Sequence, residues 1–229
     1  KYKDKLASFF ARVMYNYDQR YFLSASVRFE GSSKFGKEAS KTLGRWGVFP
    51  SISASWNIAG EDFMAQYDNL DDMKLRFGYG VTGNMPGSSY LYLMTVGAGG
   101  DYIFSNGQFI QPWGPTSNVN PTIRWEEKHE FNLGYDFATF KNRFTGSLDL
   151  YFRNTTDLLY EYDVPMPPYP YGKRWDNYGQ IYNYGVELQL NGTPIRTKNW
   201  NWDISLNAAW NNNKVVRITG EQYGTEGVE

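Results

Sequence analysis

The sequence predicts an all-β protein, a transmembrane antiparallel β-barrel of which this chain supplies about eight strands. Three observations favour this fold class. Apolar and polar residues alternate over long stretches, which is the period of a strand with two different faces. The predicted strands are long, roughly 9 to 14 residues, whereas a tilted membrane strand needs ~9–11 and soluble strands usually have ~5–6. Finally, aromatic residues make up 18% of the chain and gather near the ends of the apolar rows.

The first four predicted strands each separate an apolar face from a polar face. The short turn DQR joins the first two, whose odd-numbered positions are apolar or aromatic, although Phe10 and Met14 are apolar residues on the other face. The third strand opposes its apolar row with serines, and the fourth opposes its apolar row with Lys74 and Arg76. The alternation places these strands at 6–17, 21–30, 46–58 and 74–82.

The remaining four strands repeat the pattern. The fifth sets an apolar row against Glu130 and Asp136, and the sixth sets its row against Asp149 and Arg153. The seventh sets an apolar row against Glu187 and several amides, and the eighth alternates tryptophan and aliphatic residues with asparagine, serine and aspartate. These strands are predicted at 124–137, 144–155, 181–192 and 200–212.

The distribution of charge distinguishes a lipid-facing surface from a protein core. From the second strand onward the apolar rows carry almost no charged residue, with Glu127 as the exception. Tyrosines and tryptophans near the row ends suit the two headgroup levels of a bilayer. The opposite rows suit a wide aqueous lumen, and the residues predicted to face it are Arg28, Glu30, Arg76, Asp149, Arg153 and Glu187.

Connector lengths predict the orientation in the membrane. Short and long connectors alternate along the chain, as expected for a barrel with periplasmic turns and extracellular loops. The connector 59–73 is of intermediate length and could hold a helical turn on the periplasmic side. The segments predicted to face outward are 31–45, 83–123, 156–180 and 213–229.

Five sequence blocks resemble those of one family. They are RFEGSSKFG at 28–36, WGVFPSISASWNIAGEDF at 46–63, MKLRFGYGVTGN at 73–84, IRWEEKHEFNLGYDFATFKNRFTGSLDLYFRNTTDLL at 123–159 and NYGQIYNYGVEL at 177–188. In this order they resemble the SusC/RagA-type TonB-dependent outer-membrane transporters. Glu30 stands where that family usually has aspartate, and Met73 stands where it has leucine.

The resemblance implies a barrel of about 22 strands with an N-terminal plug in the outer membrane, crossed many times by the chain. Residues 1–229 would be an internal part of the single barrel domain, since the chain starts at Lys1 and contains no counterpart of the plug or of the TonB-contacting segment. It also implies import of a bulky nutrient, commonly a glycan or an oligopeptide. The implied partners are a SusD-like surface lipoprotein, the TonB complex and outer-membrane lipid.

The sequence offers no catalytic or metal-binding arrangement. His129 is the only histidine and there is no cysteine, so a zinc site built from these residue types is not expected. Glu126 and Glu127 are adjacent and would point to opposite faces of a strand. We therefore expect no enzyme activity, no metal and no cofactor. A net charge of −1 gives no reason to expect nucleic acid.

The two longest predicted loops are rich in aromatic residues. Such rings stack on sugars or peptide side chains and anchor protein interfaces, but they also pack loop against loop. All three roles remain open for the loop residues that we single out as ligand or partner contacts, which are Tyr90, Tyr92, Tyr102, Trp113, Tyr169, Tyr171 and Trp175.

Two alternative interpretations belong to different classes. The first is an outer-membrane barrel enzyme or adhesin, which paired acids or a His–Asp–Ser arrangement at the outer rim would support. The second is a soluble carbohydrate-binding β-sandwich, whose strands also alternate. Extraction distinguishes the second, because a sandwich would stay in the aqueous phase without detergent.

Overall fold

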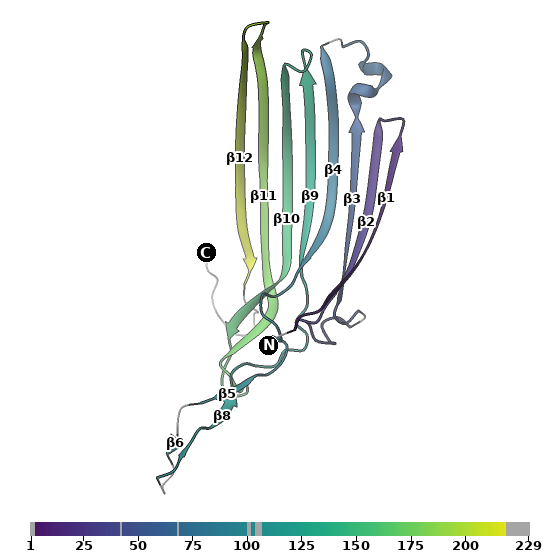
Figure 1. Cartoon of the computed structure of the whole chain (residues 1–229). Coiled ribbons are helices and arrows are strands. Elements are labelled where there is room, and N and C mark those ends of the chain that lie inside the picture. Colours follow the sequence, from purple (N-terminus) through teal and green to yellow (C-terminus); the bar gives the residue numbers. More distant parts are fainter. Residues whose placement is uncertain (1–2, 42, 68, 100–101, 104–106, 219–229) are drawn as a thin grey trace.

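A computed structural model describes residues 3–41, 43–67, 69–99, 102–103 and 107–218. Its main element is one eight-stranded sheet in which every pair of neighbouring strands is antiparallel (Figure 1). In the described part of the chain, the first and last strands form the two edges of this sheet, so the barrel is open here. The strands, in sheet order, are β1 (Leu6–Tyr17), β2 (Tyr21–Ser32), β3 (Trp46–Asn57), β4 (Leu70–Asn84), β9 (Glu126–Thr139), β10 (Phe144–Asp163), β11 (Lys173–Arg196) and β12 (Asn201–Arg217).

All eight predicted strands are present, which confirms the fold class, but several are longer than predicted. The last strand continues to Arg217, into the predicted outer segment 213–229, and the differences are largest for β10 and β11. Strand β10 continues to Asp163 and β11 begins at Lys173, so most of the predicted loop 156–180 is a strand hairpin. The register shifts between Thr155 and Leu159, where Asp157 has a φ of 56°. A bulge of this kind interrupts the alternation of side chains, which is why the pattern there looked like a loop.

The strand register joins the apolar residues into continuous rows across the sheet. One row runs from β1 to β12 through directly paired residues: Tyr15, Leu23, Ala54, Phe77, Leu133, Leu150, Val186 and Trp210. Seven of these eight are large side chains, and nearly all of those seven are exposed. No protein core lies behind this apolar face in the described chain, as expected for a surface that contacts lipid.

Aromatic side chains mark both ends of the apolar face. At the loop end, the Trp46 ring stacks on Phe29 with centroids 4.7 Å apart, and at the turn end Trp56 stacks on Tyr21 at 6.4 Å. The ten residue-to-residue steps from Trp46 to Trp56 span ~33 Å of extended strand, or ~25 Å across the membrane at a tilt of ~40°. This height matches the apolar band of an outer-membrane barrel.

The connectors differ strongly between the two ends of the sheet. The turn end carries short connectors and two 3-10 turns, Ile58–Gly60 and Asp62–Met64, which confirms the predicted helical turn in 59–73. Between β4 and β9 the loop end carries a projecting finger (Figure 1) of four short strands, β5 (Val96–Ala98), β6 (Tyr102–Ile103), β7 (Phe109–Ile110) and β8 (Trp113–Pro115). No helix among the described residues could cross a bilayer.

Candidate functional site

The polar face of the sheet carries the six residues predicted to line the lumen. The register places Arg76, Asp149 and Glu187 in one transverse row and Arg153 in a second row beside Glu130. Arg28 and Glu30 lie on the same face of β2. The structure therefore puts all six on one surface, in three separate groups.

Arg76 is the centre of the largest charged group. Its Nε donates to Asp136 Oδ2 at 2.6 Å on the neighbouring strand, and its Nη2 donates to Asp149 Oδ1 at 3.1 Å, two strands away. The second bond passes over Gly134, where a Cβ atom would lie 2.6 Å from the Arg76 guanidinium carbon. The glycine thus allows one guanidinium to join three strands on the polar face.

The other two groups are smaller. Arg28 pairs with the buried Glu30 at 2.7 Å and donates to the Ser8 hydroxyl at 3.1 Å. Arg153 pairs with Glu130 at 3.1 Å, and Lys128 reaches the same carboxylate at 3.3 Å. Arg28 and Glu30 balance each other, whereas Arg76 contacts two carboxylates and Glu130 contacts two cations. Opposite charges thus lie beside one another across or along strands in every group.

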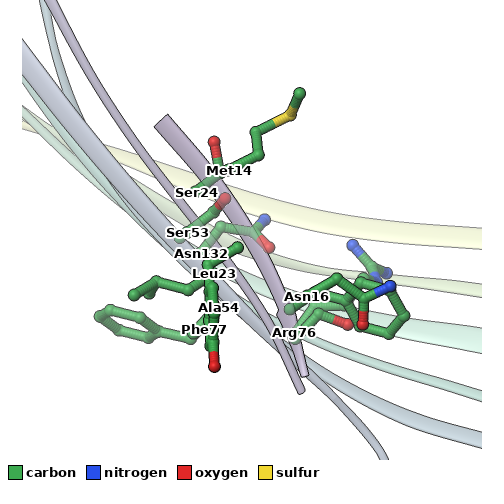
Figure 2. Close-up of a pocket in the computed structure, with 13 residues that line it drawn as sticks. Met14, Asn16, Leu23, Ser24, Ser53, Ala54, Arg76, Phe77 and Asn132 are labelled. Carbon is green, nitrogen blue, oxygen red and sulfur yellow. The ribbon is translucent and has the colours of Figure 1, made fainter. Parts of the chain in front are cut away.

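Between the charged groups lies a surface of small residues. Serines of β2 and β3 face one another here, and the hydroxyls of Ser26 and Ser51 are 2.7 Å apart. A hollow of about 520 Å³ borders this surface, and its lining combines Ser24 and Asn132 of the polar face with Leu23 and Phe77 of the apolar row (Figure 2). Because the serine side chains of β2 and β3 are short, a ligand or a protein segment can lie close to the strands here.

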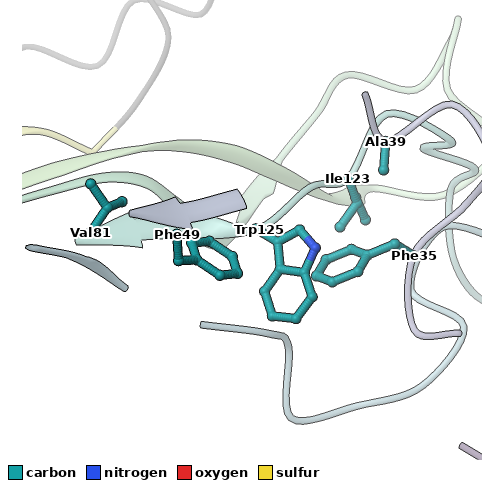
Figure 3. Close-up of a cluster of buried hydrophobic side chains, with 6 residues drawn as sticks. All are labelled: Phe35, Ala39, Phe49, Val81, Ile123 and Trp125. Atoms are coloured by element: carbon teal, nitrogen blue, oxygen red, sulfur yellow. The ribbon is translucent and has the colours of Figure 1, made fainter. Parts of the chain in front are cut away.

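The buried core of the described chain lies at the loop end and not behind the sheet (Figure 3). The Trp125 ring packs on Phe35 at 4.8 Å and on Phe49 edge to face at 5.4 Å. The Phe49 ring lies over Gly47 and Gly83, where a Cβ atom would come within 2.5 Å and 2.0 Å of it. The complete cluster is Phe35, Ala39, Phe49, Val81, Ile123 and Trp125.

Asparagine side chains fasten the long loop to β11 beside this core. Asn177 accepts the Arg124 amide at 2.9 Å and donates to the Arg124 and Asp157 carbonyls at 2.9 Å and 2.7 Å. Asn118 and Asn120 donate to backbone carbonyls of Lys173 and Trp175. All three asparagines are buried, so these bonds satisfy polar groups that water does not reach.

A carboxylate of the fourth sequence block, Glu126, supports the same part of the rim. Glu126 accepts the Leu159 amide at 2.8 Å beside the bulge and the Asn84 amide group at 2.7 Å. Arg124 pairs with Asp157 at 2.5 Å. Trp125, Glu126, Asn84 and Asn177 all belong to the sequence blocks, which therefore meet at this outer rim. Periodicity alone could not have found this core, because its residues come from loops and strand ends far apart in sequence.

The seven loop aromatics have different environments. Tyr90 and Tyr92 are half-buried with ring centroids 6.4 Å apart, and Trp175 packs against the buried core. Tyr169 accepts a bond from Arg174 at 3.1 Å. Tyr171 is tied through its backbone to Asn118, whereas Trp113 on the finger is 70% exposed. The side chain of Tyr102 lies outside the described residues.

His129, the remaining titratable candidate, lies between a tyrosine and a glutamate. His129 Nδ1 lies 3.0 Å from the Tyr79 hydroxyl, and its Nε2 lies 3.5 Å from Glu127. No group of three histidine, cysteine, aspartate or glutamate side chains that could hold a metal ion occurs in the part of the chain that the structure describes.

At the turn end, Glu61 holds the aromatic belt together. Its Oε1 accepts bonds from the Tyr21 hydroxyl at 2.6 Å and Trp56 Nε1 at 2.9 Å, and its Oε2 accepts one from Arg20 at 3.2 Å. The hydrogen bond from Tyr21, followed by that from Trp56, lowers the pKa of the Glu61 carboxyl below its ordinary value. Sequence reasoning did not single out Glu61, although the second sequence block contains it.

Comparisons with known proteins agree with this geometry. The family model described as "TonB dependent receptor-like, beta-barrel" matches residues 1–227. The chain is 35% identical over 226 residues to the TonB-dependent receptor SusC of Bacteroides thetaiotaomicron, covering 95% of this chain and 21% of that protein. It is 33% identical over 216 residues to the TonB-dependent receptor P39 of Formosa agariphila, covering 94% of this chain and 20% of that protein.

Solved structures show the same arrangement of strands. The RagAB peptide importer in its open-open state superimposes with a TM-score of 0.82 at 29% identity, covering 97% of this chain and 23% of that chain. The FrpB iron transporter from Neisseria meningitidis, at 11% identity, has a TM-score of 0.58 over 93% of this chain and 26% of its own, a likeness of fold alone. The chain spans about a fifth of the length of the curated relatives it matches.

Proposed function

The chain belongs to the TonB-dependent receptor-like β-barrel family, whose members lie in the outer membrane, and on this premise we propose that it forms eight consecutive wall strands of a nutrient importer. The whole protein would take up a glycan or an oligopeptide, together with a SusD-like surface lipoprotein and with energy from the TonB complex. Residues 1–229 would be part of one barrel domain, and the plug would lie elsewhere in the whole protein.

One observation carries the proposal: the sheet has an exposed apolar face without a core and a polar face with paired charges. The first face suits lipid and the second suits a water-filled lumen. On this basis Arg28, Glu30, Arg76, Asp149, Arg153 and Glu187 line the route of the ligand or contact the plug. Transport along such a wall requires no nucleophile, so we propose that the protein is not an enzyme and needs no cofactor.

The roles proposed for the loop aromatics depend on how exposed each side chain is. Trp113 is free to contact a ligand or the lipoprotein because most of its surface is exposed. Trp175 is better explained by packing within the rim core. The name of the RagAB peptide importer, whose structure is similar to this chain, supports the oligopeptide class, and the glycan class rests on the resemblance to the SusC/RagA-type transporters.

Uptake in the native bacterium tests the proposed transport. We expect deletion of the whole receptor to abolish uptake of one class among fluorescent oligosaccharides and oligopeptides, and a plasmid copy to restore it. Dissipating the proton gradient should block that uptake in the complemented strain. Unchanged uptake of every probe, or release of the receptor into the aqueous phase without detergent, would overturn the proposal.

Purification of the tagged receptor in mild detergent tests the partner. We expect an acylated surface protein to co-purify in a fixed ratio, and W113A to be the variant among the loop aromatics that lowers this ratio or ligand uptake. Recovery of the receptor alone under several mild detergents would contradict the lipoprotein partnership while leaving the barrel assignment untouched.

A further inference from the structure

The connector between β3 and β4 folds onto the lipid-facing side of the sheet. Glu61 of this connector binds the side chains of Tyr21 and Trp56, both of which belong to the apolar face. Farther along, the Phe140 amide donates to the Asn69 carbonyl at 2.9 Å, so the connector also contacts the turn between β9 and β10. The connector therefore lies beside the membrane at the short-turn end, which is the periplasmic end in this barrel class.

A hollow of about 580 Å³ opens between this connector and that turn. Its lining is mainly apolar and includes Met64, Tyr67, Leu70, Met73, Thr139 and Phe140. Met73 pairs with Phe137, and Thr139 pairs with Phe144, both on the lipid-facing side of the strands. The volume falls within the range of ordinary ligand pockets, and the site lies at the level of the inner leaflet.

Two cations follow the lining residue Phe140 within the next three positions of the chain. Lys141 and Arg143 follow Phe140 in the turn, and both are exposed. Neither side chain forms an ion pair with another described residue, and the nearby Asp71 carboxylate instead accepts the Asn142 amide at 2.8 Å. An apolar hollow with two such cations close by in the chain is complementary to an amphiphile with an anionic head.

We propose that this hollow binds one anionic glycerophospholipid of the periplasmic leaflet. An acyl chain lies among Met64, Leu70 and Met73, and the phosphate contacts Lys141 and Arg143. Tyr67 and Phe140, each with more than half of its surface exposed, border the lipid's acyl chain at the headgroup level. This site depends on the barrel fold and is independent of the nutrient that the receptor transports.

Lipid titration of the whole, delipidated receptor tests the site. With phosphatidylglycerol as the probe, native mass spectrometry should count one tightly bound lipid, and phosphatidylethanolamine should bind more weakly. K141Q/R143Q should weaken phosphatidylglycerol binding about tenfold and remove the preference between the two lipids. The matched control R196Q/K198Q removes two cations from the next turn, whose residues do not line this hollow, and should leave binding unchanged.

Filling the hollow provides a second arm. T139W places a large ring among the lining residues and should abolish the tight site, whereas I195W, on the lipid-facing side of β11, should not. In the unaltered receptor, a phosphatidylglycerol with a photoreactive acyl end should cross-link to peptides containing 64–73 or 139–140. Non-saturable binding, an equal effect of the control variants, or cross-links only to other peptides would each overturn the proposal.

Discussion

At the scale of single residues, Arg76 shows how a glycine can determine a charge network. The guanidinium reaches Asp149 only because Gly134, which lies between them in the sheet, has no side chain. Pattern reasoning placed Arg76 and Asp149 on the polar face. It could not pair them, because contact across an intervening strand depends on the register of three strands.

G134A tests this crossing. The new methyl group would occupy the path of the Arg76 guanidinium, so we expect loss of the Asp149 bond and a decrease of about 1 kcal/mol in stability. Thermal unfolding of the detergent-solubilised receptor measures the change. G78A is the matched control, because its Cβ would lie 4.0 Å from its nearest neighbour. Equal stabilities of G134A and G78A would contradict the assignment.

Glu61 is the second residue with a specific physical role. Because its pKa is lower in the folded protein than in the unfolded chain, it stabilises the fold above the unfolded pKa. That contribution is lost as the pH falls through the folded pKa. We therefore expect the contacts of Glu61 with Tyr21 and Trp56 to weaken at acidic pH, below the ordinary pKa of glutamate.

E61Q should accordingly lower stability at neutral pH and flatten its dependence on pH between neutral and strongly acidic buffer. Urea unfolding in micelles, followed by tryptophan fluorescence at several pH values, measures both effects. D62N is the control, since Asp62 also contacts Arg20 but its side chain is 93% exposed. A steep acid dependence that persists in E61Q would show that another group is responsible.

At the scale of elements, the outer rim depends on segments that are distant in sequence. Phe35 follows β2, Phe49 lies in β3 and Trp125 immediately precedes β9. The long loop is then fixed to β11 by Asn118, Asn120 and Asn177. The loop end is thus an ordered cap on the strands, and the finger of β5–β8 projects from it.

W125A tests the rim core. Removing this buried ring should cost about 3 kcal/mol or more and should loosen the attachment of the long loop. Limited proteolysis of intact cells should then cut within 83–123 faster than in the unaltered receptor. W113A, which removes an exposed tryptophan from the finger, should change stability by no more than about 0.5 kcal/mol. Equal cleavage of both variants would contradict the rim core.

At the scale of the whole molecule, the sheet separates two solvents. Neighbouring residues Leu133 and Asn132 lie on the lipid-facing and polar faces of β9. L133R should destabilise folding into vesicles by about 2 kcal/mol or more, because it places a cation in the apolar band. N132R should fold normally. Equal folding yields in a vesicle insertion assay would show that the apolar face does not contact lipid.

The sequence blocks predicted the family, and the comparisons confirm it. This prediction needed no knowledge of the contacts in the structure, because five family-like blocks rarely occur in the same order along one chain by chance. The roles of the loop aromatics in binding ligand or partner stay predictions. The sequence did not predict the proposed periplasmic lipid site, because that site depends on how the connector between β3 and β4 folds against the sheet.

By itself, the sequence determined which residues face lipid and which face the polar side, because the period of a strand is local and each residue's face follows from its neighbours. Only the tertiary structure decided that the buried core lies at the outer rim, that Arg76 joins three strands and that the 59–73 connector folds toward the membrane. Those features depend on strand register, a bulge at Asp157 and contacts between distant segments, none of which a local period encodes.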